Sequence, residues 1–283
     1  MDEVVVVGYG TQKKVNLTGS VASITPETIE NRPITQTSQA LAGLTSGVTV
    51  SQSSGRPGGD QASIRIRGVG TFSGAGSDPL VLIDGLSASI NDVDPNNIAN
   101  ISILKDAASS AIYGTRAANG VILIETKRGK KGVTQVAYNG YVGWLKATEL
   151  PDFLDSWDYA IMRNEADKNS GLSATYDQND IDKFRNGSDP DNYPNVNHLK
   201  DLVTSGSGFQ TGHNVTLSNG GEKLSYFFSL GYLHQEGIVE QNDYSKYNFQ
   251  LNIDNQILSN LLLKATLSGY ASTTNEPYTG DGD

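Results

Sequence analysis

The sequence predicts a mixed α/β domain over roughly the first 130 residues, followed by antiparallel strands of an incomplete membrane β-barrel. The first half alternates short apolar strands with short helix signals. In the last third, apolar and polar residues alternate with period two, so each expected strand has one apolar face and one polar face. The connections between these strands are alternately long and short, which is typical of outer-membrane barrels.

Capping and turn signals predict the elements of the α/β domain. A strand over residues 19–24 precedes Thr25-Pro26-Glu27, which favours a helix start because it offers a capping hydroxyl, a first-turn proline and an early acid. A second helix is expected over residues 36–42, ending at Gly43. Further strands are expected at 48–51, 62–67, 80–84, 101–104 and 121–127, with a helix from an Asp106 cap to Ile112.

The strands of the second part follow a linker at residues 129–132. The first has Val136, Tyr138, Gly140, Val142 and Trp144 on one face, and others are expected at 209–218, 224–235, 245–254 and 261–271. In the strand 245–254, the apolar face reads Tyr247, Phe249, Leu251 and Ile253, and the polar face reads Lys246, Asn248, Gln250, Asn252 and Asp254. We expect lipid on the apolar face and a filled lumen on the polar face. A soluble sandwich would also have two-faced strands, but it does not require alternating connections.

Charge separates one long connection from the rest of the chain. The net charge is −10, and residues 147–206 hold 12 acidic against 5 basic side chains. A nucleic-acid partner is disfavoured because phosphate binding needs clustered Lys and Arg. A helix is expected near residues 157–166, where Trp157 and Tyr159 either pack the helix or contact a ligand or partner.

The N-terminal strip Asp2, Glu3, Val4, Val5, Val6 and Val7 has two interpretations. Four successive valines favour extended backbone, so the strip could be an ordinary strand of this domain. Alternatively, it is a mobile peptide that adds itself to the sheet edge of another protein.

Signals for catalysis and for metal binding are weak. The three histidines, His198, His213 and His234, are scattered, and the chain has no cysteine. The run Asp177–Asp182 has some spacing of a calcium loop, but it lacks the glycine at the sixth position and the acid at the twelfth. We therefore expect no enzyme, no cofactor and no metal site.

Several sequence segments resemble segments of the SusC/RagA family of TonB-dependent outer-membrane transporters of Bacteroidetes, and they occur in the same order as in that family. The strip Asp2–Gly10 resembles the TonB box of that family. Four blocks resemble its plug domain: Ser63–Gly68, Pro79–Gly85, Ile103–Gly114 and Arg116–Ile122. The resemblance implies a TonB box and linker at 1–14, a plug domain at 15–130, and the first five barrel strands at 131–283 with an extracellular loop at about 147–206.

The family's architecture is a barrel of about 22 strands that the plug blocks. TonB, energised by an inner-membrane complex, would pair with Asp2–Val7 and pull on the plug. Arg65 and Arg67 share one strand face, and the resemblance favours a latch between them and barrel carboxylates over two solvated surface arginines. Because five strands cannot close a barrel in lipid, we expect the chain to be a fragment.

The implied function is energy-coupled import at the outer membrane, foremost of an oligosaccharide, although the family also handles peptides. A SusD-like surface lipoprotein would act as the lid. The alternatives are a siderophore or cofactor importer with the same plug, and a surface-exposed β-rich binding module. Substrate-contacting residues are not predicted individually. The plug apices, where such residues would lie, are expected to include residues 53–59 and 70–77, which are rich in glycine and serine and therefore mobile.

Overall fold

The computed structural model describes residues 4–7, 10–13, 21–29, 32, 34–59, 61–68, 76–106, 111–203 and 205–277. The chain divides into two compact units, one of which consists of residues 145–208 with 238–240 and is called the helical unit. The other unit contains an N-terminal domain and a sheet of long strands. Among the described residues, every helix is too short or too polar to cross a membrane.

The N-terminal domain is built on a five-stranded mixed sheet of order β3-β8-β9-β6-β7. Its strands are β3 Val21–Ile24, β6 Leu80–Ile83, β7 Leu86–Ser87, β8 Ile98–Leu104 and β9 Val121–Thr126. Only the β6–β9 pair is parallel. Two separate two-stranded sheets join β4 Val48–Ser51 to β5 Ser63–Ile66, and β1 Val4–Val7 to β2 Gly10–Lys13. The helices are α1 Pro26–Ile29, α2 Thr37–Ala40 and the 3-10 turns η2 Ile90–Asp92, η3 Pro95–Asn97 and η4 Ala111–Ala117.

An apolar cluster covers each face of the central strands β8 and β9. One cluster contains Ile101, Ile103, Ile122 and Ile124 with residues of α1, α2, β4 and β5. The other contains Leu82, Leu104, Val121 and Leu123 with Ala117. The core of this domain therefore lies on both sides of a single sheet.

Most elements expected in this domain are confirmed, with boundaries within one to three residues. The expected turn at Asp84 and Gly85 is present, with φ of 48° and 87°, and it joins β6 to β7 as a tight hairpin. The helix expected from Asp106 to Ile112 lies mainly outside the described residues, and residues 111–117 form the 3-10 turn η4 instead.

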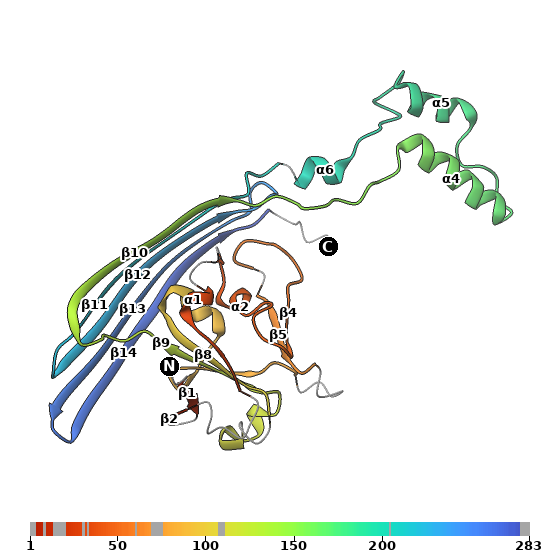
Figure 1. Cartoon of the computed structure of the whole chain (residues 1–283). Coiled ribbons are helices and arrows are strands. Elements are labelled where there is room, and N and C mark those ends of the chain that lie inside the picture. Colours follow the sequence, from red (N-terminus) through yellow and green to blue (C-terminus); the bar gives the residue numbers. More distant parts are fainter. Residues whose placement is uncertain are drawn as a thin grey trace, which may run out of the picture. The chain divides into compact units, whose positions relative to one another are not determined.

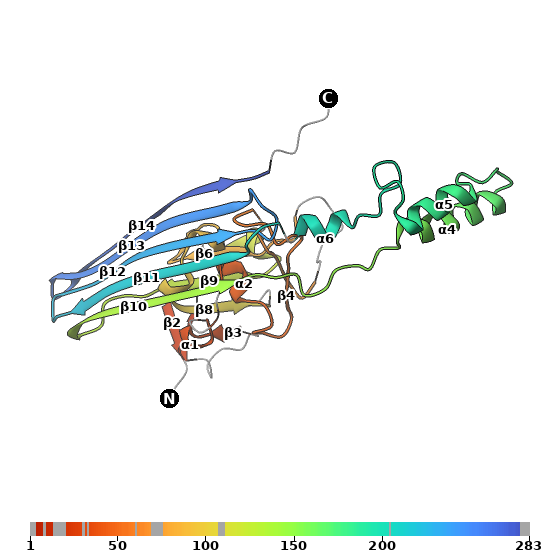
Figure 2. The ribbon, with the colours of Figure 1, turned by 90° about the horizontal axis from the view of Figure 1, so that it is seen from above.

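The second part is an antiparallel sheet, called the wall sheet below, whose five strands follow one another in chain order (Figures 1 and 2). They are β10 Gly132–Trp144, β11 Phe209–Gly220, β12 Leu224–Glu236, β13 Asp243–Leu258 and β14 Leu261–Asn275. The alternation of long and short connections is confirmed. Residues 145–208 and 237–242 form the long connections, while 221–223 and 259–260 form the short ones.

The two faces of the wall sheet differ as the period-two pattern predicts. Apolar side chains on one face are exposed, including Val136, Tyr138, Leu230, Tyr247 and Leu267. Polar side chains on the other face are buried, including Gln210, Asn214, Ser229, Gln250 and Asn252. Phe227 is an apolar exception on the buried face. The buried polar face is called the inner face below.

The helical unit contains α4 Ser156–Asn169, α5 Gln178–Asn186 and α6 His198–Val203. The expected helix near 157–166 is confirmed, whereas the sequence patterns indicate neither α5 nor α6. The run with partial calcium-loop spacing begins α5, because the carboxylates of Asp177 and Asp180 each accept the other residue's main-chain N–H in a capping box. Within the described part of the chain, no cluster of three or more His, Asp or Glu side chains could hold a metal ion.

Candidate functional site: contacts between the N-terminal domain and the wall sheet

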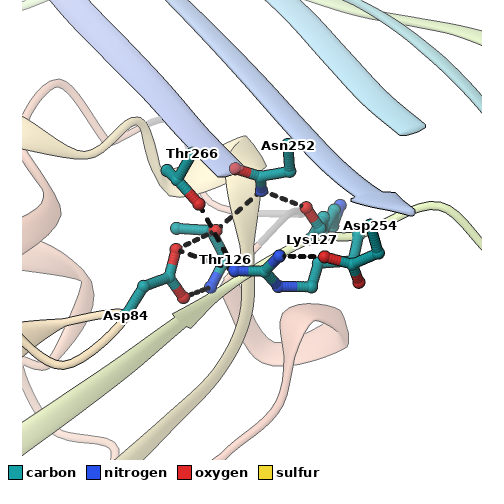
Figure 3. Close-up of polar contacts among 7 residues, drawn as sticks. Asp84, Thr126, Lys127, Asn252, Asp254 and Thr266 are labelled. Carbon is teal, nitrogen blue, oxygen red and sulfur yellow. Dashed lines mark hydrogen bonds and ion pairs between the residues drawn. The ribbon is translucent and has the colours of Figure 1, made fainter. Parts of the chain in front are cut away.

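Arg128, two residues after β9, joins the N-terminal domain to the wall sheet. Its Nη1 atom lies 2.6 Å from Oδ1 of Asp254 on β13, and its Nη2 donates to Oγ1 of Thr266 on β14 at 3.3 Å. The side chains of Arg128 and Asp254 are 28% and 20% exposed, so water screens this ion pair only partly. Figure 3 shows Asp254 and Thr266 at this contact.

A second set of hydrogen bonds surrounds Thr126, the last residue of β9 (Figure 3). Asp84 accepts from Thr126 N at 3.0 Å and from its Oγ1 at 2.5 Å. From β13, Asn252 Nδ2 donates to Thr126 Oγ1 at 2.8 Å and to the main-chain oxygen of Lys127 at 2.6 Å. Asn252 is 1% exposed and sits on the inner face, so β9 is tied to the wall by a buried polar network.

The electrostatic balance of this region is set by Glu125, Asp84 and Asp254 against Arg128 and Lys264. Burial raises the pKa of the Glu125 carboxyl, and the nearby Asp84 carboxylate raises this pKa further. A hydrogen bond from Asn100 and the positive charges of Arg128 and Lys264 oppose that rise. The region is therefore crowded with carboxylates, and Arg128 is the cation that contacts two of them.

A second contact lies on one cross-strand row of the inner face. The row contains Asn139, Asn214, Gly231, Asn248 and Tyr270, which are direct partners in the strand register. Asn248 Nδ2 donates to Asp94 Oδ2 at 2.9 Å, and Asn214 Nδ2 lies 3.5 Å from the same oxygen. Asn139 Nδ2 donates to Asn96 Oδ1 at 3.0 Å. The start of η3 therefore docks on side-chain amides from three strands.

Gly231 leaves the space that this docking needs. A Cβ atom there would lie 2.8 Å from Asp94 Oδ2 and 2.5 Å from Asn248 Oδ1. Lys246 lies two residues before Asn248 on β13 and on the same face. Its Nζ donates to the main-chain oxygen of Asn91 at 2.8 Å and lies 4.6 Å from the centre of the Tyr270 ring.

The loop 53–59, expected at an apex of the N-terminal domain, also contacts the wall sheet. Arg56 Nη1 lies 3.0 Å from Glu276 Oε2, with both side chains 45% exposed. At Gly58, a Cβ atom would collide with the Tyr244 ring, so the loop backbone approaches that ring closely. A surface ion pair of this exposure contributes little energy.

A cavity of about 810 Å³ opens between η2, η3 and the inner face. Side-chain amides and tyrosines dominate its polar lining: Gln36, Gln61, Asn91, Asn96, Asn139, Tyr141, Gln210, Tyr244, Asn248 and Tyr270. Its charged lining is balanced, with Arg32 and Lys246 against Asp92 and Asp94. Tyr141 OH and Asn248 Oδ1 are buried and have no hydrogen-bond partner among the described residues.

Arg65 and Arg67, expected to form a latch on the wall, have other partners among the described residues. Arg65 Nη1 lies 3.4 Å from Asp78 Oδ1, and Arg67 pairs with Asp106. Both acids belong to the N-terminal domain, since Asp78 precedes β6 and Asp106 follows β8. Arg128 is the arginine that pairs with a carboxylate of the described wall sheet, Asp254. Pairing of Arg65 or Arg67 with other strands stays a prediction.

The residues expected to bind TonB are only partly described. Asp2 and Glu3 lie outside the described residues, whereas Val4–Val7 form β1.

Sequence reasoning missed Arg128, Asn252 and Asp94 as plug–wall contact residues. The available signal for Arg128 was its position at the junction of the two parts, where a cation can reach both.

Three comparisons with known proteins bear on this arrangement. Residues 13–121 match the family model of the TonB-dependent receptor plug domain. TonB-dependent receptor P26 of Formosa agariphila is 38% identical over 261 residues, which cover 90% of this chain and 25% of that protein. TonB-dependent receptor SusC of Bacteroides thetaiotaomicron is 36% identical, with 89% of this chain and 24% of that protein covered.

Solved structures agree with these matches. The RagAB peptide importer in its open-open state is 29% identical, with a TM-score of 0.77, and the match covers 97% of this chain and 33% of that one. The siderophore receptor PirA from Pseudomonas aeruginosa shares the fold at 17% identity and a TM-score of 0.54, with 91% of this chain and 36% of that one covered.

An α/β domain bonded to the polar face of a two-faced antiparallel sheet defines a TonB-dependent receptor, with the N-terminal domain as plug and the wall sheet as barrel wall. Receptors of this class lie in the outer membrane and are not enzymes. Within the class, the chain belongs to the SusC/RagA type. It spans about a quarter of the length of the curated relatives it matches.

Proposed function

We propose that the complete receptor imports an oligosaccharide across the outer membrane, driven by TonB and its inner-membrane energising complex. The observation that carries this proposal is the polar character of the plug–wall contacts. Asn, Asp, Arg and Thr side chains make these contacts. Water can replace such contacts when the plug moves, whereas an apolar interface of the same size would resist separation.

The cavity lining supports a neutral, hydroxyl-rich ligand. Planar amides donate and accept hydrogen bonds, and tyrosine rings offer flat apolar faces, which together suit a sugar chain. The balance of two cations and two carboxylates gives no reason to favour a strongly charged substrate. A peptide is the second candidate, because the structurally similar RagAB is a peptide importer. A SusD-like surface lipoprotein is proposed as the lid in either case.

TonB is proposed to pair with Asp2–Val7 through main-chain hydrogen bonds, as strand addition requires. Deleting residues 2–7 from the complete receptor should abolish uptake of a fluorescent oligosaccharide by cells. Equilibrium binding of the same oligosaccharide by the purified receptor should remain, because the cavity residues are unchanged. Undiminished uptake by the deletion variant would contradict energy coupling through this segment.

The choice between ligands needs a variant in the cavity and a matched control outside it. Tyr141→Phe removes one hydroxyl and keeps the ring, and it should weaken oligosaccharide binding about tenfold if that buried hydroxyl meets a sugar. Tyr138→Phe is the control, because Tyr138 lies on the exposed apolar face. Tight binding of peptides and none of oligosaccharides would replace the first candidate with the second.

A further inference from the structure

The segment proposed to bind TonB is already half of a β-hairpin. β1 pairs with β2 in antiparallel register, with Val4 opposite Lys13, Val5 opposite Gln12, Val6 opposite Thr11 and Val7 opposite Gly10. The two residues between the strands lie outside the described residues. The pair forms its own two-stranded sheet, so within the described chain each strand keeps one unpaired edge.

The register fixes which main-chain groups face which edge. In a hairpin with a two-residue connection, the pair next to the connection exchanges both hydrogen bonds, and the pattern then alternates along the strands. Val7 and Val5 therefore direct their N–H and C=O groups to β2. Val6 and Val4 direct theirs to the free edge of β1.

The free edge of β1 lacks the devices that usually protect an edge strand. Natural sheets block exposed edges with charges, prolines or bulges. Residues 4–7 contain neither charge nor proline, whereas β2 carries Lys13 and is followed by Lys14. A strand from another protein would therefore be admitted at the edge of β1 more readily than at the edge of β2.

We propose that the hairpin, and not a single extended strand, is the docking surface for the energising protein. A strand of that protein adds to the free edge of β1 through the main-chain groups of Val4 and Val6, while β2 stays paired. This inference rests on the proposed function, because that function supplies the partner. It adds a role for Gly10–Lys13, which then serves as a positioning segment.

The β1–β2 pairing and the pairing of β1 with the partner strand stabilise each other. An isolated two-stranded hairpin is marginally stable in water, and a third strand stabilises it. In turn, β2 holds β1 extended before the partner arrives, so less conformational entropy is lost on binding. The competing possibility is that β2 occupies the edge that the partner needs and must be displaced first.

A reversible cross-link separates these two possibilities. Val6 and Thr11 oppose each other as a non-hydrogen-bonded pair, the closer kind, and residues 1–283 contain no cysteine. The complete receptor with Val6→Cys and Thr11→Cys is titrated with the purified periplasmic domain of TonB, oxidised and then reduced. We expect the oxidised receptor to bind as tightly as the reduced one or up to about tenfold tighter. Binding lost on oxidation and recovered with a reductant would overturn the inference.

Two proline variants in β2 give an independent test. Gln12→Pro removes an N–H that bonds to β1, whereas Thr11→Pro removes one that faces the free edge of β2. We expect Gln12→Pro to weaken TonB binding about tenfold and Thr11→Pro to leave it nearly unchanged. Equal affinities for the two variants would show that the hairpin has no part in docking.

The wild-type receptor keeps this inference separate from the proposed function. If the wild type and the reduced cysteine variant fail to bind the TonB domain, the proposed function fails. If both bind and only the hairpin variants behave against expectation, the proposed function stands and the hairpin inference fails.

Discussion

Replacing Arg128 or Asp254 should loosen the plug from the barrel wall. Their atoms Nη1 and Oδ1 are 2.6 Å apart, and the side chains are 28% and 20% exposed. Breaking a fully buried pair costs about 3–5 kcal/mol, whereas an exposed pair contributes at most about 1 kcal/mol. For side chains about a quarter exposed, an intermediate loss of about 2 kcal/mol is expected from Arg128→Met or Asp254→Asn. That loss equals about a thirtyfold change in the equilibrium for opening.

Amide hydrogen exchange measures this opening in the complete receptor. Amides of β9, Val121–Thr126, should exchange about thirtyfold faster in either single variant. The double variant should lose less than the sum of the single losses, because the first change already breaks the pair. Arg163→Met is the control, since its pair with Asp167 lies within the helical unit and not at the plug–wall contact. Single effects below about threefold, or strictly additive effects, would refute the assigned role of this pair.

Three further changes test other parts of the structure. Gly231→Ala should speed exchange in residues 91–97, because its methyl group would crowd Asp94; unchanged exchange would count against the docking on the inner face. Glu125→Gln should increase the free energy of unfolding at pH 7 by less than about 1 kcal/mol, seen as a higher melting temperature of the receptor. The reason is that a raised pKa means that the ionised carboxyl destabilises the fold. This gain should shrink as the pH falls through the raised pKa and vanish below the ordinary value of 4.5, and a gain that persists there would contradict the assignment. Asp177→Ala should destabilise α5 by about 1 kcal/mol through loss of its cap, measurable as faster exchange over 178–186.

The sequence alone determined the faces of the long strands. Neighbouring side chains in a strand point to opposite sides, so Tyr247 and Phe249 had to share one surface and Asn248 and Asn252 the other. This rule is local and needs no knowledge of the rest of the molecule. The positions of β8 and β9 were also expected from sequence, but that apolar clusters cover both faces of their sheet is seen only in the structure.

The helices of the acidic connection were less predictable from sequence. The run from Asp177 to Asp182 had metal-loop features, yet the carboxylates of its first and fourth residues form the capping box at the start of α5. The same residue types serve both purposes, and only the backbone conformation distinguishes them.

Only the tertiary structure decided which polar groups meet across the plug–wall contact. Arg128 and Asp254 are 126 positions apart in the chain, and Asp94 and Asn248 are 154 apart. Their meeting depends on the stagger of the strands and on how the plug docks, and neither is encoded in a local pattern. For that reason local patterns could not single out Arg128 as a plug–wall contact. Among the described residues, Arg65 and Arg67 pair with Asp78 and Asp106 of the plug, and their pairing with further strands stays a prediction.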